Sequence, residues 1–157
     1  MRFGVLGPTT VWTDDGAVVP VSGVKVRALL THLALHVGTP VTADRLIEDL
    51  WDEPTRRNPA GALSAKVSQL RRALEDAEPG GRTLVVSPPP GYRLDVDPGA
   101  VDAVEFERLV ADAQAGSDAR RSVRTLERAL ALWRGPVCAE FADAEFTRPT
   151  VTRLDDL

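Results

Sequence analysis

The chain has 157 residues and a formal net charge of −4, and 43% of its residues are apolar, which is enough to form a core and excludes disorder as the main state. No apolar stretch approaches the roughly 20 residues of a bilayer span, and the N-terminus is too short in apolar residues and too rich in Gly and Pro for a signal peptide. One cysteine and two histidines can form neither a disulfide within the chain nor a closed Cys/His zinc site, so we expect a reduced, cytoplasmic protein without membrane segment, metal or cofactor.

The N-terminal residues predict a small antiparallel sheet. Residues 2–6 alternate between polar and apolar types, and residues 9–13 are mostly β-branched or aromatic. A turn at residues 14–16 leads into a third short strand at residues 17–21.

Three helices are expected next. The first follows Ser22, a good N-cap residue, and ends near Gly38. Thr42 is placed to cap the second, and Asn58 followed by Pro59 is the preferred start of the third. The third helix has one apolar stripe with helical spacing, formed by Leu63, Val67, Leu70 and Leu74.

A hairpin and a linker follow these helices. Residues 83–87 and 92–96 are expected as strands, joined by a rigid turn of three prolines and a glycine. The composition changes at the linker of residues 97–99, so we predict two units with the bounds 1–97 and 98–157. The fold class is then mostly α with small β-sheets.

Residues 98–157 predict helices, with an irregular stretch at residues 137–149. Asp102 with Glu105 resembles a capping box, Ser117 is placed to cap the next helix, and residues 150–157 form a last one. Two or three helices cannot enclose a core of their own, so we expect the truncated start of a helical-hairpin array that docks on the N-terminal sheet and the first helix. The apolar residues expected to pack in this way are Val104, Phe106, Leu109, Val123, Leu126, Leu130 and Trp133.

Charge is distributed unevenly along the chain. Residues 54–93 carry seven basic and three acidic residues, whereas the segments on either side are acidic. No acidic residue occurs between Arg56 and Leu74. A basic island in an acidic chain favours a localised contact with a polyanion, because salt screens charges beyond about 8 Å.

Three short helices followed by a hairpin are the order of a winged helix-turn-helix, in which the third helix enters the major groove of DNA. The alternative interpretation of this helix is an amphipathic helix with a solvated basic face; the hairpin and the local charge favour DNA. Residues opposite the apolar stripe are expected at base edges or nearby phosphates, and they are Ala65, Lys66, Gln69 and Arg72. Phosphate contacts are expected from Arg56, Arg57, Arg71 and Arg93. Thr42, at a helix N-terminus, can add a backbone contact to a phosphate.

Several segments resemble the Streptomyces antibiotic regulatory protein family, in the same order along the chain. They are residues 46–51 (LIEDLW), 62–74 (ALSAKVSQLRRAL) and 89–94 (PPGYRL), together with residues 1–8 and 129–136. The resemblance implies an OmpR-type winged-helix domain joined to a bacterial transcriptional activation domain of tetratricopeptide-like helices. It also implies an activator of secondary-metabolite gene clusters that binds double-stranded DNA, recruits the RNA polymerase holoenzyme and is found in the cytoplasm with the nucleoid.

The resemblance further implies that two copies bind side by side on direct repeats, about 10–11 bp or one helical turn apart. Two residues depart from the family pattern: Gln69 stands where an arginine is usual, and Pro88 where a basic residue is common. Because Gln pairs with adenine and Arg favours guanine, we expect a shifted operator sequence.

Two other classes of function stay open. A helical adapter that never touches DNA would account for the acidic helices after Asp102, although it has no need of an acid-free basic face. An enzyme would need a convergent polar site, and the sequence shows no nucleophile–base pair or paired carboxylates. His32 and His36 have the spacing of metal ligands but no recognisable third ligand, so we expect surface or partly packed histidines.

Overall fold

The computed structural model describes residues 1–51 and 57–157. Its first element is an antiparallel sheet of order β1–β2–β3, in which Val11 pairs with Phe3 on one side and with Val19 on the other. The strands are β1 (Arg2–Gly4), β2 (Thr10–Trp12) and β3 (Val18–Val19). The predicted N-terminal sheet is therefore present, with shorter strands than the sequence pattern indicates.

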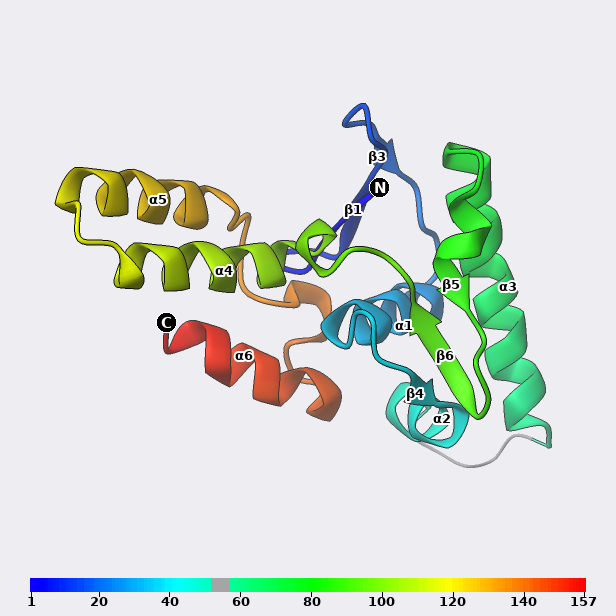
Figure 1. Cartoon of the computed structure of the whole chain (residues 1–157). Coiled ribbons are helices and arrows are strands. Elements are labelled where there is room, and N and C mark those ends of the chain that lie inside the picture. Colours follow the sequence, from blue (N-terminus) through cyan, green and yellow to red (C-terminus); the bar gives the residue numbers. More distant parts are fainter. Residues whose placement is uncertain (52–56) are drawn as a thin grey trace.

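Three helices and a second sheet, of order β4–β6–β5, come next (Figure 1). The elements are α1 (Val24–Leu35), β4 (Val41–Thr42), α2 (Ala43–Leu50), α3 (Pro59–Ala77), the 3-10 turn η1 (Gly81–Leu84), β5 (Val85–Val86) and β6 (Gly91–Leu94). This order confirms the predicted winged helix, and we call β5, β6 and their connecting turn the wing. The first wing strand starts later than expected because η1 occupies the residues before it.

Local capping explains where two of these helices begin. As predicted, the Thr42 hydroxyl accepts a hydrogen bond from the third amide of α2 (3.2 Å), and the Asn58 side chain accepts one from the third amide of α3 (3.0 Å). The expectation that Ser22 caps α1 is wrong. Gly23 precedes the helix with a φ of 94° and without a side-chain cap, and glycine adopts this backbone conformation with little strain.

The apolar stripe of α3 fixes the orientation of that helix. All four predicted residues of the stripe are buried, and they belong to the same core as Leu29, Leu30 and Leu33 of α1. Full burial of one such side chain contributes about 1.5–3 kcal/mol. Because this face is held in the core, the opposite face of α3 must point toward solvent.

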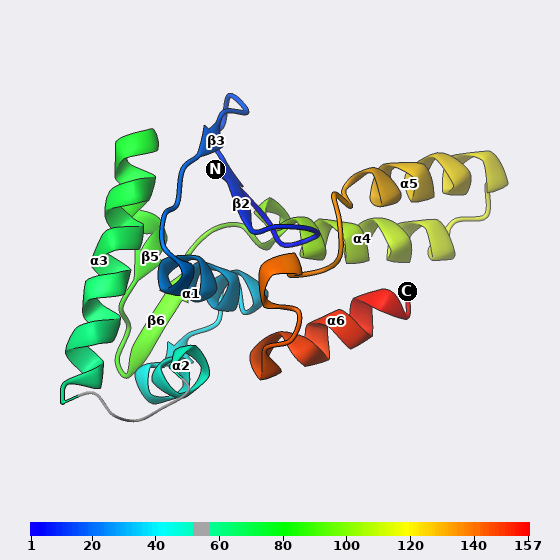
Figure 2. The same cartoon turned by 180° about the vertical axis from the view of Figure 1, so that it is seen from behind.

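The remaining residues are helical, apart from their connecting turns. The elements are η2 (Pro98–Ala100), α4 (Asp102–Ala115), α5 (Ala119–Ala131), η3 (Ala139–Phe141), η4 (Glu145–Thr147) and α6 (Arg148–Asp155). Helices α4 and α5 form an antiparallel hairpin that extends away from the winged helix, and α6 is joined to α4 by an Arg153–Glu107 ion pair of 3.0 Å (Figures 1 and 2). No helix in the described ranges is long and apolar enough to cross a membrane.

Both helix caps predicted in this segment need correction. Asp118, rather than Ser117, caps α5 by accepting hydrogen bonds from the Arg120 and Arg121 amides. Asp102 and Glu105 do not form a capping box, because the N-cap position of α4 belongs to Val101. The buried Asp102 carboxylate has distant partners instead.

Asp102 joins α4 to the segment that leaves β1. One carboxylate oxygen accepts a hydrogen bond from the Val5 amide (2.8 Å) and the other from the Leu6 amide (3.2 Å). On the other side of this segment, the Arg134 amide donates to the Leu6 carbonyl (2.8 Å) and the Cys138 amide to the Val5 carbonyl (2.7 Å). The expected docking on the N-terminal sheet is confirmed, and it is made largely by backbone groups.

The first helix supplies the second part of this docking surface, as expected. The ring of Phe146 stacks on His32 of α1 with a centroid distance of 4.7 Å. The Arg27 guanidinium donates to the Glu140 carboxylate (Nε to Oε2, 2.8 Å), and this hydrogen bond lowers the pKa of Glu140. The last third of the chain therefore contacts both the sheet and α1.

The α4–α5 hairpin is less buried than the sequence predicts. Val123, Leu126 and Leu130 form a stripe on α5 and are 54%, 40% and 66% exposed, so the expectation that they pack against other helices is wrong for the described residues. Trp133 is half-buried, with its ring edge-on to Phe106 at 5.3 Å. The hairpin therefore joins the core mainly through α4 residues such as Phe106, whereas α5 contributes Ala129.

His32 is completely buried, which corrects the expectation of a surface or partly packed side chain. Its Nε2 lies 2.7 Å from an Asp49 carboxylate oxygen on α2. Burial lowers the pKa of His32 and outweighs the opposing effect of the Asp49 hydrogen bond. The ring is thus held as a neutral group where α1, α2 and Phe146 meet.

Replacing Asp102 should weaken the docking of the two halves. Asp102→Ala leaves two backbone amides without their acceptor, and we expect the free energy of unfolding to fall by about 2–4 kcal/mol. Urea denaturation followed by tryptophan fluorescence measures this change. The control is Asp112→Ala, which removes an exposed carboxylate from the same helix and should change stability by less than about 0.5 kcal/mol. Equal losses for the two variants would contradict this role.

The protein should lose stability on mild acidification. The unfolded chain titrates at His32 near pH 6.5, above the folded value, so the unfolded state binds the proton more tightly. The stability due to neutral His32 is therefore complete above about pH 6.5 and is lost as the pH falls, by at most about 1.4 kcal/mol per unit. Urea titrations between about pH 7.5 and about pH 5.5 test this in comparison with His32→Gln, whose profile should be flatter. Parallel profiles would assign the pH dependence to other groups.

Candidate nucleic-acid interface

The outer face of α3 carries three of the predicted base-contacting residues. Ala65, Gln69 and Arg72 are exposed and lie opposite the buried stripe, because spacings of four and three residues follow one line along a helix. In both views α3 stands at the edge of the molecule that is farthest from the α4–α5 hairpin (Figures 1 and 2). This face is therefore open to a duplex.

Two cations on or beside this face have no acidic partner among the described residues. Lys66 is half-buried at the flank of α3, and Arg72 projects from its exposed face. Within the described ranges, neither side chain forms an ion pair or a hydrogen bond with another side chain. Their positive charge is thus available to a phosphate or to a base edge.

A groove of about 730 Å³ separates α3 from the first wing strand. Its lining consists of guanidinium, hydroxyl and apolar groups, from Ser68, Arg71, Arg72, Arg82, Thr83, Val85, Val86 and Ser87. Guanidinium and hydroxyl donors are typical of surfaces that contact the phosphates of DNA. Arg82 was not among the predicted site residues, although it belongs to the basic island; only folding of η1 brings it beside α3. It also forms a 3.6 Å ion pair with Glu75.

Arg71 is oriented differently from Arg72. Its Nε donates to the Val85 carbonyl (2.9 Å) and its Nη2 donates to the Ser87 hydroxyl (2.6 Å). The side chain that the sequence assigns to phosphate is therefore directed at the wing. Arg72, the next residue in the helix, points about 100° away.

The wing turn is anchored beside the start of α2. The Ala43 amide donates to the Pro90 carbonyl (3.1 Å), and the Thr42 hydroxyl is used by the Arg45 amide. Two of the first three amides of α2 thus already donate hydrogen bonds within the protein. Few amides are left to bind the phosphate expected near Thr42. Gly91 allows the close approach of β6, because a Cβ there would lie 1.8 Å from the Val41 carbonyl oxygen.

The other predicted phosphate contacts are spread around α3. Arg57 is exposed just before the start of the helix. Arg93 lies on β6 opposite Val86, with its guanidinium 3.8 Å from the Asp95 carboxylate. Arg56 lies outside the described residues. The structure brings Arg71 and Arg72 together in one groove and leaves Arg57 and Arg93 at separate positions around it.

Metal ligands and thiols are the other reactive groups of interest in the described ranges. In the part of the chain that the structure describes, no three His, Cys, Asp or Glu side chains cluster as ligands for a metal ion. The single thiol, Cys138, is buried, and burial raises its pKa to about 12, so it is not a nucleophile at neutral pH.

Comparison with known families gives two matches that together include most of the chain. Residues 22–94 match the C-terminal domain of transcriptional regulatory proteins. Residues 101–157 match the bacterial transcriptional activator domain. The first match contains α3 and the wing, and the second contains the helices that dock on the N-terminal sheet.

Known regulators of actinobacteria are similar over nearly the whole chain. The transcriptional regulatory protein EmbR of Mycobacterium tuberculosis is 36% identical over 98% of this chain and 40% of its own length. The transcriptional regulator RedD of Streptomyces coelicolor is 31% identical over 100% of this chain and 48% of its own. The regulatory protein DnrI of Streptomyces peucetius is 27% identical over 99% and 60%. The chain thus spans about half the length of these relatives.

A solved structure of M. tuberculosis EmbR, in complex with a low-affinity phosphopeptide, has the same fold. It matches 99% of this chain and 41% of its own, with a TM-score of 0.89 and 34% sequence identity. The resemblance seen in the sequence agrees with the winged helix, with the activator domain that follows it in the chain, and with the related regulators. The chain belongs to the Streptomyces antibiotic regulatory protein family of transcriptional regulators.

Proposed function

We propose that this protein is a transcriptional activator that binds specific DNA sequences through α3 and the wing. The proposal rests on one observation: the exposed face of α3, which carries Arg72 and has Lys66 at its flank, adjoins a groove lined by three arginines. The family supports it, since its members are transcriptional regulators. The proposed target is the promoter region of a secondary-metabolite gene cluster, reached in the cytoplasm at the nucleoid.

Salt dependence is the first test of DNA binding. Neutralising about six phosphates should make log K fall against log salt with a slope of about −5. A gel-shift titration with a short duplex of random sequence measures the slope, and selection from a randomised pool then yields the operator. A slope near zero would contradict the proposal and favour the alternative function, a helical adapter without direct DNA binding.

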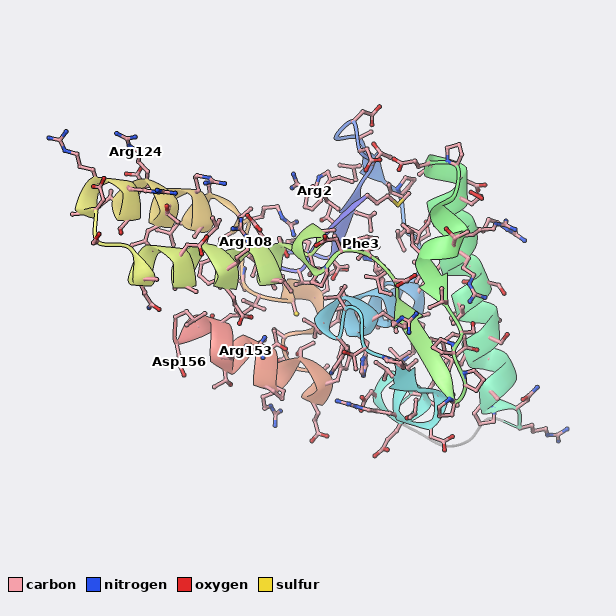
Figure 3. The ribbon with its side chains drawn as sticks, in the orientation of Figure 1. Arg2, Phe3, Arg108, Arg124, Arg153 and Asp156 are labelled. Carbon is pink, nitrogen blue, oxygen red and sulfur yellow. The ribbon has the colours of Figure 1, made fainter. Side chains whose placement is uncertain are left out.

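Arg72 should act in binding and not in folding. Arg72→Ala should weaken binding to the selected duplex by about 5- to 150-fold and make the salt slope shallower by about one if the contact is to phosphate. Its free energy of unfolding should change by less than about 0.5 kcal/mol, because the side chain is exposed. Arg124→Ala is the matched control: Arg124 is an exposed arginine on α5, at the end of the molecule far from α3 (Figure 3). If Arg72→Ala unfolds the protein, or if both variants bind alike, α3 has been assigned the wrong role.

The proposed division of labour places DNA binding in residues 1–97 and contact with the RNA polymerase holoenzyme in residues 98–157. The exposed apolar stripe of α5 favours a protein partner for this second segment. Two copies are proposed to bind head to tail on direct repeats about 10–11 bp apart.

Footprinting on the selected DNA tests the arrangement of the two copies. We expect protection of a direct repeat and a further gel shift when purified holoenzyme is added. Protection of an inverted repeat by a stable two-fold dimer would contradict the head-to-tail arrangement. If the double variant Leu126→Asp, Leu130→Asp binds the holoenzyme as well as the unaltered protein does, α5 is not part of the polymerase contact.

A further inference from the structure

A side chain of α3 reaches the outer edge of the wing. In the sheet order β4–β6–β5, the outer edge of β5 has no strand partner within residues 1–51 and 57–157. The Asp95 amide donates to the Leu84 carbonyl (2.7 Å), and successive residues of an antiparallel strand direct their polar groups to opposite sides. The Val85 carbonyl therefore points away from β6. It accepts the hydrogen bond from Arg71 Nε.

The guanidinium of Arg71 reaches two points of the wing at once. Val85 is 2% exposed, so its carbonyl lies where loss of a partner is costly. Ser87, which accepts from Nη2, is exposed and directly precedes the proline-rich turn. One planar side chain thus spans β5 from its first residue to the turn, which the single ammonium of a lysine could not do.

The opposite side of the wing has its own anchors. Gly91 and Tyr92 of β6 pair with Thr42 and Val41 of β4, which fixes β6 to the start of α2. Arg71 supplies the corresponding anchor between β5 and α3. The wing is therefore held from both sides, and the hydrogen bonds of Arg71 join its outer strand to α3.

We infer that Arg71 is a positioning residue, which sets the spacing between α3 and the wing and leaves contact with phosphate to Arg72. This inference rests on the proposed DNA-binding function and names the part that one of its arginines plays. The two adjacent arginines divide the work because the helix turns by about 100° per residue: Arg71 faces the wing and Arg72 faces solvent.

Four variants separate positioning from direct contact: Arg71→Ala, Arg71→Lys, Ser87→Ala and, as the matched contact variant, Arg72→Ala. Ser87→Ala keeps the arginine and frees part of its guanidinium. If Arg71 positions the wing, Ser87→Ala should weaken binding to the selected duplex about threefold, as expected for one lost hydrogen bond, and Arg71→Ala about tenfold or more. Arg71→Lys should not restore affinity, because lysine keeps the charge but loses the two-point contact.

The salt slope distinguishes the roles of the two arginines. Arg72→Ala should make the slope shallower by about one, whereas Ser87→Ala should leave it unchanged. If Ser87→Ala binds like the unaltered protein, Arg71→Lys restores affinity and Arg71→Ala alters the slope by about one, then Arg71 contacts phosphate directly and the inference is overturned.

Hydrogen exchange in the absence of DNA keeps the inference testable on its own. Arg71→Ala and Ser87→Ala should both speed exchange of the Val86 amide in β5, and Arg72→Ala should not. Unchanged exchange in the first two variants would show that Arg71 does not hold the wing. Faster exchange in a protein that fails to bind any duplex would instead support the anchor and refute the proposed function.

Discussion

The two halves of this molecule are held together by hydrogen bonds to the backbone of the short segment that follows the first strand. Val5 and Leu6 are completely buried, and their amides and carbonyls need partners that no neighbouring strand supplies. Asp102 satisfies the amides, and the chain after α5 satisfies the carbonyls. Because each of these groups would otherwise be buried without a hydrogen bond, the contacts are needed by the first half as much as by the second. The hydrogen bonding of this N-terminal segment is thus completed by groups about a hundred or more residues away along the chain.

Hydrogen bonds and ion pairs within the protein also determine which positive charges on the winged helix remain available for DNA. The buried stripe of α3 fixes the rotation of the helix, which turns Arg71 to the side of the wing and Arg72 and Gln69 to solvent. Arg82 and Arg93 are partly neutralised by carboxylates in their own half. The positive charge of the basic island is therefore carried by fewer side chains than the sequence indicates, and Arg71 and Arg72 among them line the groove beside α3.

Features that depend on neighbours in sequence could be predicted, and features that depend on distant partners could not. The caps at Thr42 and Asn58 and the stripe of α3 follow from residues within one or two helical turns. Asp102 has the spacing of a capping box, but its true partners are the Val5 and Leu6 amides, which no local pattern reveals. For the same reason the burial of His32, against a phenylalanine from the far end of the chain, was not predictable. In the candidate interface the residue types were predictable, whereas the direction of Arg71 required the register of β5.

The docking has a mechanical consequence for an activator. A flexible tether would allow the second half to take many positions relative to DNA, but here the connection at residues 97–99 is short and ends in the η2 turn. The α4–α5 hairpin has a fixed direction and distance relative to the winged helix. The contacts that fix it are backbone hydrogen bonds, the Arg27–Glu140 pair and the Phe146–His32 stack. When α3 is bound in a groove of the proposed operator, the exposed stripe of α5 therefore points in one direction relative to the helix axis. A partner on that stripe would therefore be placed by the position and orientation of the proposed site on DNA.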